Sequence, residues 1–195
     1  MEATNLVAAT GDGSLASPGE EQDLVAAAAA APAAFEAVYL AYRTPVYRYL
    51  RSLVRTDDEA ADLTALTFER ALRDIRRYRG SGSAVGWLLR IARNAAIDAG
   101  RRQRPTVPWQ DAEARQLAVA DPPLDEAVAQ RERVRELQAA VRSLPAPTRD
   151  AIALRFGAGL SAREIGAVIG KSEAATQKLI TRGLAALKEA HRAQD

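Results

Sequence analysis

Apolar residues recur at spacings of three and four along most of the chain, which is the period of an amphipathic helix. The first clear series runs from Phe35 to Leu53, and Pro45 within it predicts a kink or local break. Its apolar members are Phe35, Val38, Tyr39, Tyr42, Val46, Tyr49, Leu50 and Leu53. A T-x-x-E capping sequence at Thr56 and Glu59 predicts the start of a second helix. The residues expected on its buried side are Ala61, Ala65, Phe68, Leu72 and Ile75.

Breaks in the pattern divide the rest of the chain into further helices. The glycines at 80 and 82 precede two short helical segments, at about residues 84–93 and 95–104. Residues 105–126 are rich in proline and predict a flexible, extended linker. Pro147 suits the first turn of a later helix, where the missing N–H has no partner in any case. The helix before it is indicated by the apolar stripe Val134, Leu137, Val141 and Leu144.

Two capped helices joined by a glycine turn are expected near the C-terminus. Ser161 and Glu164 form a capping box, Gly170 can end the first helix, and Ser172 can cap the second. This is the arrangement of a helix-turn-helix, whose second helix lies in the major groove of DNA. The inward positions of the second helix are Thr176, Leu179 or Ile180, Gly183 and Leu187. A plain helical hairpin with a polar outer face is the alternative.

The amino-acid composition argues against several classes of function. The 195 residues include no cysteine, and the single histidine, His191, lies near the C-terminus. We therefore expect no disulfide, no metal site, no cofactor and no active site. The apolar run from Leu24 to Phe35 is too short to cross a bilayer, which needs about 20 residues. No membrane insertion and a cytoplasmic location are expected.

Charge is unevenly distributed along the chain. Residues 1–34 carry five acids and no base, for a net charge of −5, and lack an apolar period. Residues 1–31 are therefore predicted to be a disordered acidic tail. Residues 35–104 carry fourteen arginines and eight acids, for +6, whereas residues 105–195 carry only +1. The basic segment favours an anionic partner such as nucleic acid, although ordinary solvated helix faces would give the same count.

Motifs in both halves of the chain resemble one family. Gly159-Leu-Ser-Ala-Arg-Glu-Ile-Gly-Ala-Val-Ile-Gly170 and Ser172-Glu-Ala-Ala-Thr-Gln-Lys-Leu-Ile-Thr-Arg182 resemble the DNA-binding domain of extracytoplasmic-function (ECF) sigma factors. Leu144-Pro-Ala-Pro-Thr-Arg149 looks like the usual entry to that domain. Gly86-Trp-Leu-Leu-Arg-Ile-Ala-Arg-Asn94, followed by Ala-Ala-Ile-Asp98, is similar to the W-L-x-R-I-A-x-N-x-x-x-D signature of the other domain. The resemblance covers about residues 33–190.

The resemblance implies an all-α protein of two small helical domains that directs RNA polymerase to promoters. Residues 32–104 would form a region 2-like domain that binds core polymerase and the minus-ten element. Residues 127–195 would form a region 4-like helix-turn-helix domain that binds the minus-thirty-five element. The expected partners are promoter DNA, the clamp helices of the β′ subunit and the flap of the β subunit. An anti-sigma protein is a further partner that the resemblance allows.

The resemblance also assigns residues to each contact. Those expected at the minus-thirty-five element are Lys171, Ser172, Glu173, Gln177, Lys178, Thr181 and Arg182. Those expected at the minus-ten element are Arg90, Arg93, Asn94, Asp98, Arg101 and Arg102, with a flipped base captured near Asn94. Those expected at core polymerase are Asp62, Ala65, Leu66, Glu69, Arg70 and Arg73.

Two departures from the family pattern leave alternatives open. Ala65 and Leu66 stand where the family usually has a polar pair that contacts polymerase, and Leu179 replaces a common arginine. A sigma-like regulator without productive polymerase binding is therefore one alternative. A dimeric helix-turn-helix repressor is another, but it leaves the first motif set unexplained. Trp87 is expected to be a core aromatic residue, and Trp109 to pack on its own domain.

Overall fold

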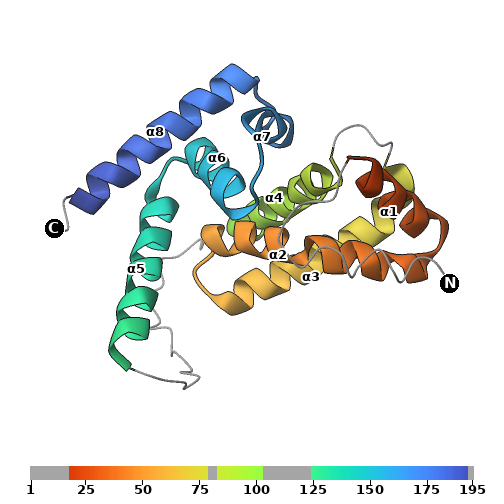
Figure 1. Cartoon of the computed structure of the whole chain (residues 1–195), viewed down its shortest axis with the longest axis horizontal. Coiled ribbons are helices and arrows are strands. Elements are labelled where there is room, and N and C mark those ends of the chain that lie inside the picture. Colours follow the sequence, from red (N-terminus) through yellow and green to blue (C-terminus); the bar gives the residue numbers. More distant parts are fainter. Residues whose placement is uncertain (1–17, 79–82, 103–123, 193–195) are drawn as a thin grey trace.

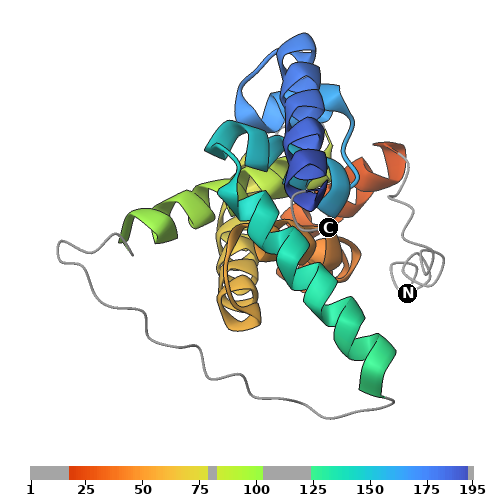
Figure 2. The same cartoon turned by 90° about the vertical axis from the view of Figure 1, so that its left-hand side faces the viewer.

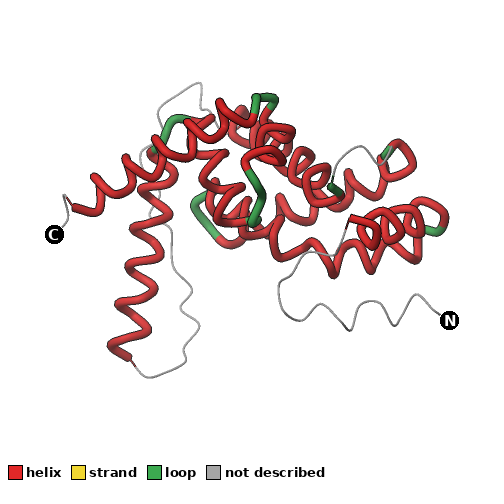
Figure 3. Tube along the Cα trace, turned by 45° about the horizontal axis from the view of Figure 1, so that its top comes forward, coloured by secondary structure: helices red, strands yellow, loops and turns green. Residues whose placement is uncertain are grey.

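The described residues, 18–78, 83–102 and 124–192 of a computed structural model, are almost entirely helical, and none of them is in a strand (Figures 1 and 3). This confirms the all-α prediction. The helices are α1 (Pro18–Ala30), α2 (Phe35–Leu53), α3 (Asp57–Asp74), α4 (Ala84–Arg102), α5 (Leu124–Ser143), α6 (Ala146–Gly157), α7 (Ala162–Ile169) and α8 (Glu173–Arg192). Two short 3-10 turns, Pro32–Ala34 and Ile75–Arg77, precede α2 and follow α3.

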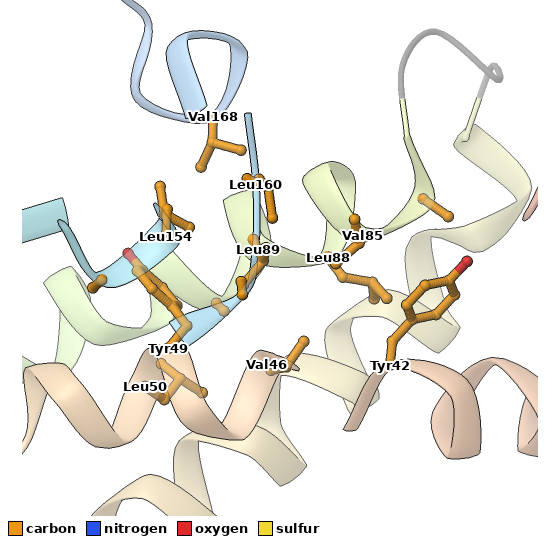
Figure 4. Close-up of a cluster of buried hydrophobic side chains, with 14 of the residues drawn as sticks. Tyr42, Val46, Tyr49, Leu50, Val85, Leu88, Leu89, Leu154, Leu160 and Val168 are labelled. Atoms are coloured by element: carbon orange, nitrogen blue, oxygen red, sulfur yellow. The ribbon is translucent and has the colours of Figure 1, made fainter. Parts of the chain in front are cut away.

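Helices α1 to α4 form an N-terminal module around the apolar face of α2. Tyr42, Val46 and Leu50 are fully buried there, opposite Leu88 and Leu89 of α4 (Figure 4). The ring of Phe68 in α3 packs edge-on against that of Phe35 at a centroid distance of 6.3 Å. The period of α2 therefore predicts its buried face, except that Tyr39 is 38% exposed and Leu53 is only partly buried.

The predicted disordered tail is wrong for residues 18–30, which form α1. Val25 and Ala28 are only 2 % exposed, and the Glu21 carboxylate accepts a hydrogen bond of 3.0 Å from the backbone N–H of Ala84. Alanine has the highest helix propensity, so a run of alanines needs few apolar contacts to become ordered. Residues 1–17 lie outside the described part of the chain.

Three further expectations for the N-terminal module need correction. Helix α2 continues through Pro45 without a break, and α4 is one helix instead of two. In α3 the buried side is shifted by about one position, so that Ala61, Ala65 and Leu72 are exposed. The residues buried instead are Ala60, Leu63, Thr64, Thr67, Phe68 and Ala71.

Buried threonines explain the error in α3. The Thr64 and Thr67 hydroxyls donate hydrogen bonds of 2.7 and 2.6 Å to the carbonyls of Ala60 and Leu63, four residues earlier. A threonine that satisfies its hydroxyl within its own helix can occupy an apolar face. A pattern that counts only apolar residues therefore misplaces this face.

Helices α5 to α8 form a C-terminal module. Helices α6 and α8 lie close together. A Cβ added at Gly183 of α8 would stand only 2.5 Å from the Ile152 side chain of α6. The stripe predicted on α5 is only half correct, since Val141 and Leu144 are buried whereas Val134 and Leu137 are 43 % and 57 % exposed. The exposed part of α5 extends away from the other helices (Figure 2).

The two modules pack against each other and share one apolar core. Tyr49 of α2 lies beside Leu154 of α6, and Val168 of α7 faces the side of α4 that carries Leu89 (Figure 4). The proline-rich residues 105–123, with Trp109, lie outside the described residues, and residues 124–126 already belong to α5.

Candidate nucleic-acid interface

The helix-turn-helix signals near the C-terminus are confirmed in detail. The Ser161 side chain accepts a hydrogen bond of 3.3 Å from the Glu164 backbone N–H, and the Glu164 carboxylate accepts one of 2.8 Å from the Ser161 N–H. Gly170 ends α7 with a φ of 71°, the left-handed conformation that glycine adopts without strain. The Ser172 side chain then accepts from the Ala175 N–H at 3.3 Å, at the start of α8.

The inner face of α8 fixes the helix on α7 and α6. Thr176 is fully buried, and its hydroxyl donates to the Ser172 carbonyl at 2.9 Å. Of the two residues left open by the pattern, Ile180 is buried and Leu179 is half-buried. This packing determines which side of α8 is exposed to solvent.

The candidate minus-thirty-five residues all lie on the outer side of this element. Each of the following is exposed: Lys171, Ser172, Glu173, Gln177, Lys178, Thr181 and Arg182. The Thr181 hydroxyl donates to the Gln177 carbonyl at 3.0 Å. The set offers two lysines and an arginine for phosphates, and a glutamine amide for a base edge.

Helix α4 separates the candidate minus-ten residues into two groups. Arg90, Asn94, Arg101 and Arg102 are exposed. Arg93 and Asp98 are half-buried and engaged in ion pairs with other helices. Trp87 is half-buried against the core, and its ring lies 5.2 Å from that of Tyr78, as expected for a core aromatic residue.

The candidate polymerase residues on α3 also divide by exposure. Asp62, Ala65, Glu69 and Arg73 are exposed, and the Arg73 guanidinium pairs with Glu69 at 3.1 Å. Leu66 packs partly against the core.

Arg70 does not belong to that exposed group. Its guanidinium lies 3.2 Å from the Asp98 carboxylate of α4, so this pair joins a candidate polymerase residue to a candidate minus-ten residue.

A polar cluster between the modules was missed by the sequence analysis. Asp150 of α6 is buried and forms a 2.7 Å ion pair with Arg93 of α4. The Tyr49 hydroxyl lies near this pair, and burial, followed by the negative charge of Asp150, raises the pKa of Tyr49 well above its ordinary value. The available signal was an acid, Asp150, at the start of the apolar run Ala151-Ile-Ala-Leu154.

A second buried acid, Glu21, lies where α1 meets α4. Burial raises its pKa, while the hydrogen bond from the Ala84 N–H acts in the opposite direction. Among the described residues there is no group of three or more acids and histidines that could hold a metal ion. No helix in that part of the chain is long and apolar enough to cross a membrane.

Two family matches follow the two modules. The Sigma-70 region 2 family matches residues 38–106, and the Sigma-70, region 4 family matches residues 134–187. The ECF RNA polymerase sigma factor SigX of Bacillus subtilis is 30% identical over 80% of this chain and 82% of SigX. RNA polymerase sigma factor CarQ of Myxococcus xanthus is 33% identical over 80% of this chain and 88% of CarQ.

Solved structures have the same fold. CnrH, in a complex with the cytosolic domain of CnrY, has a TM-score of 0.70 at 23% identity, over 90% of this chain and 99% of the CnrH chain. RpoE of Bartonella quintana, in a complex with the anti-sigma factor NepR, has a TM-score of 0.62 at 19% identity, over 83% of this chain and 98% of the RpoE chain. The sequence matches, in the order of the two helical modules, show that this chain belongs to the ECF group of sigma-70-type RNA polymerase sigma factors.

Proposed function

We propose that this sigma factor reads the minus-thirty-five element with α8 and the minus-ten element with α4, and binds core polymerase through α3. The observation that carries the proposal is the outer side of α8. All seven residues expected to contact DNA there are exposed, while the opposite side of the helix packs on α6 and α7. The functional domains are proposed to be residues 32–104 and 127–195, joined by 105–126.

Helix α4 supports the minus-ten assignment through its exposed side. Arg90 and Asn94 are one turn apart, and Arg101 and Arg102 extend the basic surface to the end of the helix. Arginines can neutralise phosphates while Asn94 contacts a base that has left the stack.

Helix α3 supports polymerase binding through its one exposed side. Asp62, Ala65, Glu69 and Arg73 recur at three and four residues along it. Their acids and arginine suit a mixed-charge partner such as the β′ clamp helices. The β flap is proposed as a second polymerase contact, on the C-terminal module. The protein would act in the cytoplasm, without chemistry of its own. An anti-sigma protein is proposed as its regulator because RpoE of Bartonella quintana was solved with the anti-sigma factor NepR.

Transcription by purified core polymerase on genomic DNA fragments tests the proposal. Adding the protein should create new transcript starts that share a two-part upstream motif. Arg182→Ala should lower the yield of these transcripts, whereas Lys188→Ala, an exposed cation two turns further along α8, should change it little. Equal loss in both variants would contradict the assignment of the outer side of α8.

A sigma-like regulator without productive polymerase binding is the second candidate, and Ala65 is the observation that favours it. This residue lies in the centre of the exposed side of α3, where it offers no hydrogen bond to a partner. Co-sedimentation with core polymerase separates the two functions. Specific DNA binding without co-sedimentation and without new transcripts would establish the regulator.

A further inference from the structure

Two arginines that are far apart in the sequence share one carbonyl oxygen at the end of α2. The Arg51 Nη1 and Arg142 Nη1 atoms each donate to the Val54 carbonyl oxygen, at a distance of 3.4 Å in both cases. Arg142 belongs to α5, which lies against the end of α2 (Figure 1). A cation at the C-terminus of a helix interacts favourably with its last carbonyls, and a single arginine is enough for that purpose. Two guanidinium groups on one acceptor therefore exceed what capping of α2 requires.

Arg55, which directly follows Val54, adds a third positive charge to this group. Its backbone N–H donates to the Glu59 carboxylate at 3.0 Å, whereas its side chain is exposed and has no hydrogen bond or ion pair with a described residue. Burial, followed by the positive charges of Arg51 and Arg55, lowers the pKa of Arg142. The three guanidinium groups, which we call the arginine cluster, are thus close enough to repel one another.

The neighbouring acid leaves most donors of the arginine cluster unused. The Asp57 carboxylate pairs with Arg51 and accepts a second hydrogen bond, of 3.0 Å, from the Tyr47 hydroxyl. Arg142 forms no ion pair with a described residue, and its one hydrogen bond to such a residue is the long bond to Val54. A guanidinium group carries several N–H donors in a fixed planar fork, so most of those on Arg142 have no acceptor in the described protein.

The unused donors of the arginine cluster suit a phosphate group better than a carboxylate. A phosphate group has enough acceptor oxygens and negative charge to bind two guanidinium forks at once, whereas a carboxylate is filled by one fork. The position of the cluster favours a small ligand over nucleic acid. The side chain of Arg51 is only 17% exposed and Arg142 is half-buried between helices, so a duplex backbone would reach them poorly.

We propose that the arginine cluster is a binding site for the phosphate group of a small phosphorylated molecule. The phosphate lies between Arg55 and Arg142, accepts from donors that no described residue uses, and reduces the repulsion among the three cations. It contacts the end of α2 and the side of α5 at once. None of the three arginines is among the residues proposed to contact DNA or polymerase, so this site is additional to the proposed function and does not depend on it.

Binding of inorganic pyrophosphate to the full chain tests the site. Isothermal titration calorimetry should show saturable binding to the parent protein at constant ionic strength, which keeps the screening of exposed charges equal in all titrations. Arg55→Gln and Arg142→Gln should each weaken this binding about tenfold or more, because each removes a charged hydrogen-bond donor. Arg76→Gln is the matched control and should bind like the parent, since Arg76 is exposed and forms no ion pair with a described residue.

The stability of the unliganded variants separates a binding site from a structural role. Arg55→Gln removes a repelled cation whose side chain has no partner among the described residues, so the free energy of unfolding in urea should stay unchanged or rise. A loss of stability in Arg55→Gln would overturn the proposal. The absence of saturable binding to the parent, or equal binding by Arg55→Gln and Arg76→Gln, would also overturn it.

Two further titrations distinguish the source of the phosphate. A mixed-sequence DNA duplex of about 40 base pairs should bind Arg55→Gln nearly as well as the parent protein, because DNA contacts are expected on α4 and α8. A loss of duplex affinity equal to the loss for pyrophosphate would assign the arginine cluster to nucleic acid and reject the small ligand. A hexaglutamate peptide should compete poorly with pyrophosphate, and tighter binding of the peptide would reject the phosphate assignment.

Discussion

Gly166 is the position where adding one methyl group should disturb the helix-turn-helix most. A Cβ at this residue would stand 2.5 Å from the Lys171 carbonyl oxygen, a backbone atom of the turn. The usual carbon–oxygen contact is about 3.3 Å or more, so the turn would have to retreat by nearly 1 Å. The Gly166 carbonyl also accepts a hydrogen bond of 2.9 Å from the Lys171 N–H, which that movement would lengthen.

The size of the effect follows from two opposing contributions. Forcing an extra carbon into a packed site typically costs about 1–3 kcal/mol. Alanine regains about 0.5–1 kcal/mol over glycine inside a helix. Gly166→Ala should therefore lower the free energy of unfolding by about 1 kcal/mol, within a range of about 0–2.5 kcal/mol.

Gly100→Ala is the matched control for this prediction. Gly100 lies in α4 with nothing within 4 Å of the Cβ position, so the same chemical change should be neutral or stabilising by up to about 1 kcal/mol. Urea unfolding followed by far-ultraviolet circular dichroism measures both variants. Changes of the same sign and size would refute the reasoning, because they would mean that the turn yields freely and that the close approach at Lys171 does not determine stability.

Three further variants test one helix cap, one exposed acid and one buried acid. Thr56→Ala removes the side chain that accepts from the third N–H of α3 and should lower the free energy of unfolding by about 1 kcal/mol in urea melts; no change would exclude the cap. The hydrogen bond from Arg51 lowers the pKa of Asp57 in the folded protein below its value in the unfolded chain. Ionised Asp57 therefore stabilises the folded protein at pH values above the unfolded pKa, and this stabilisation is lost as the pH falls through the folded pKa. In Asp57→Asn the free energy of unfolding should therefore fall less steeply as the pH is lowered. An equally steep fall in the variant and the parent protein would contradict this. Burial raises the pKa of Glu21 above 4.5, so the parent protein should lose stability relative to Glu21→Gln as pH rises above about 4.5. Thermal melts at pH 4 and pH 7 measure this difference. If the parent protein instead gains stability relative to Glu21→Gln at pH 7, the hydrogen bond from Ala84 has a larger effect on the pKa of Glu21 than burial has.

The elements best predicted from the sequence are those whose signals are local. The capping side chains of Thr56, Ser161 and Ser172 each act within one helical turn, and the structure contains all three. Gly170 is similar, because its left-handed conformation depends only on its own backbone. Such features require no knowledge of what packs against them.

Burial was predicted less well because it depends on a partner element. Leu137 is apolar and in the expected register, but no described residue covers it, so it is 57 % exposed. Helix α1 shows the converse, since its alanines give no clear period and yet Val25 and Ala28 are buried. A pattern identifies a candidate apolar side, whereas the surface that covers it lies elsewhere in the sequence.

The residues of the candidate interface also divide into those that the sequence could assign and those that depend on a distant partner. Exposed residues such as Gln177 and Arg90 were assigned from the resemblance to the family, and their exposure agrees with a position opposite a buried helix face. The state of Arg93 could not be assigned, since its position on α4 contains no information about Asp150, which is 57 residues away. An acid beside an apolar run, as at Asp150, indicates that a cation lies opposite it but does not identify which one. The contact between Arg93 and Asp150 was therefore the part of the site that only the fold could identify.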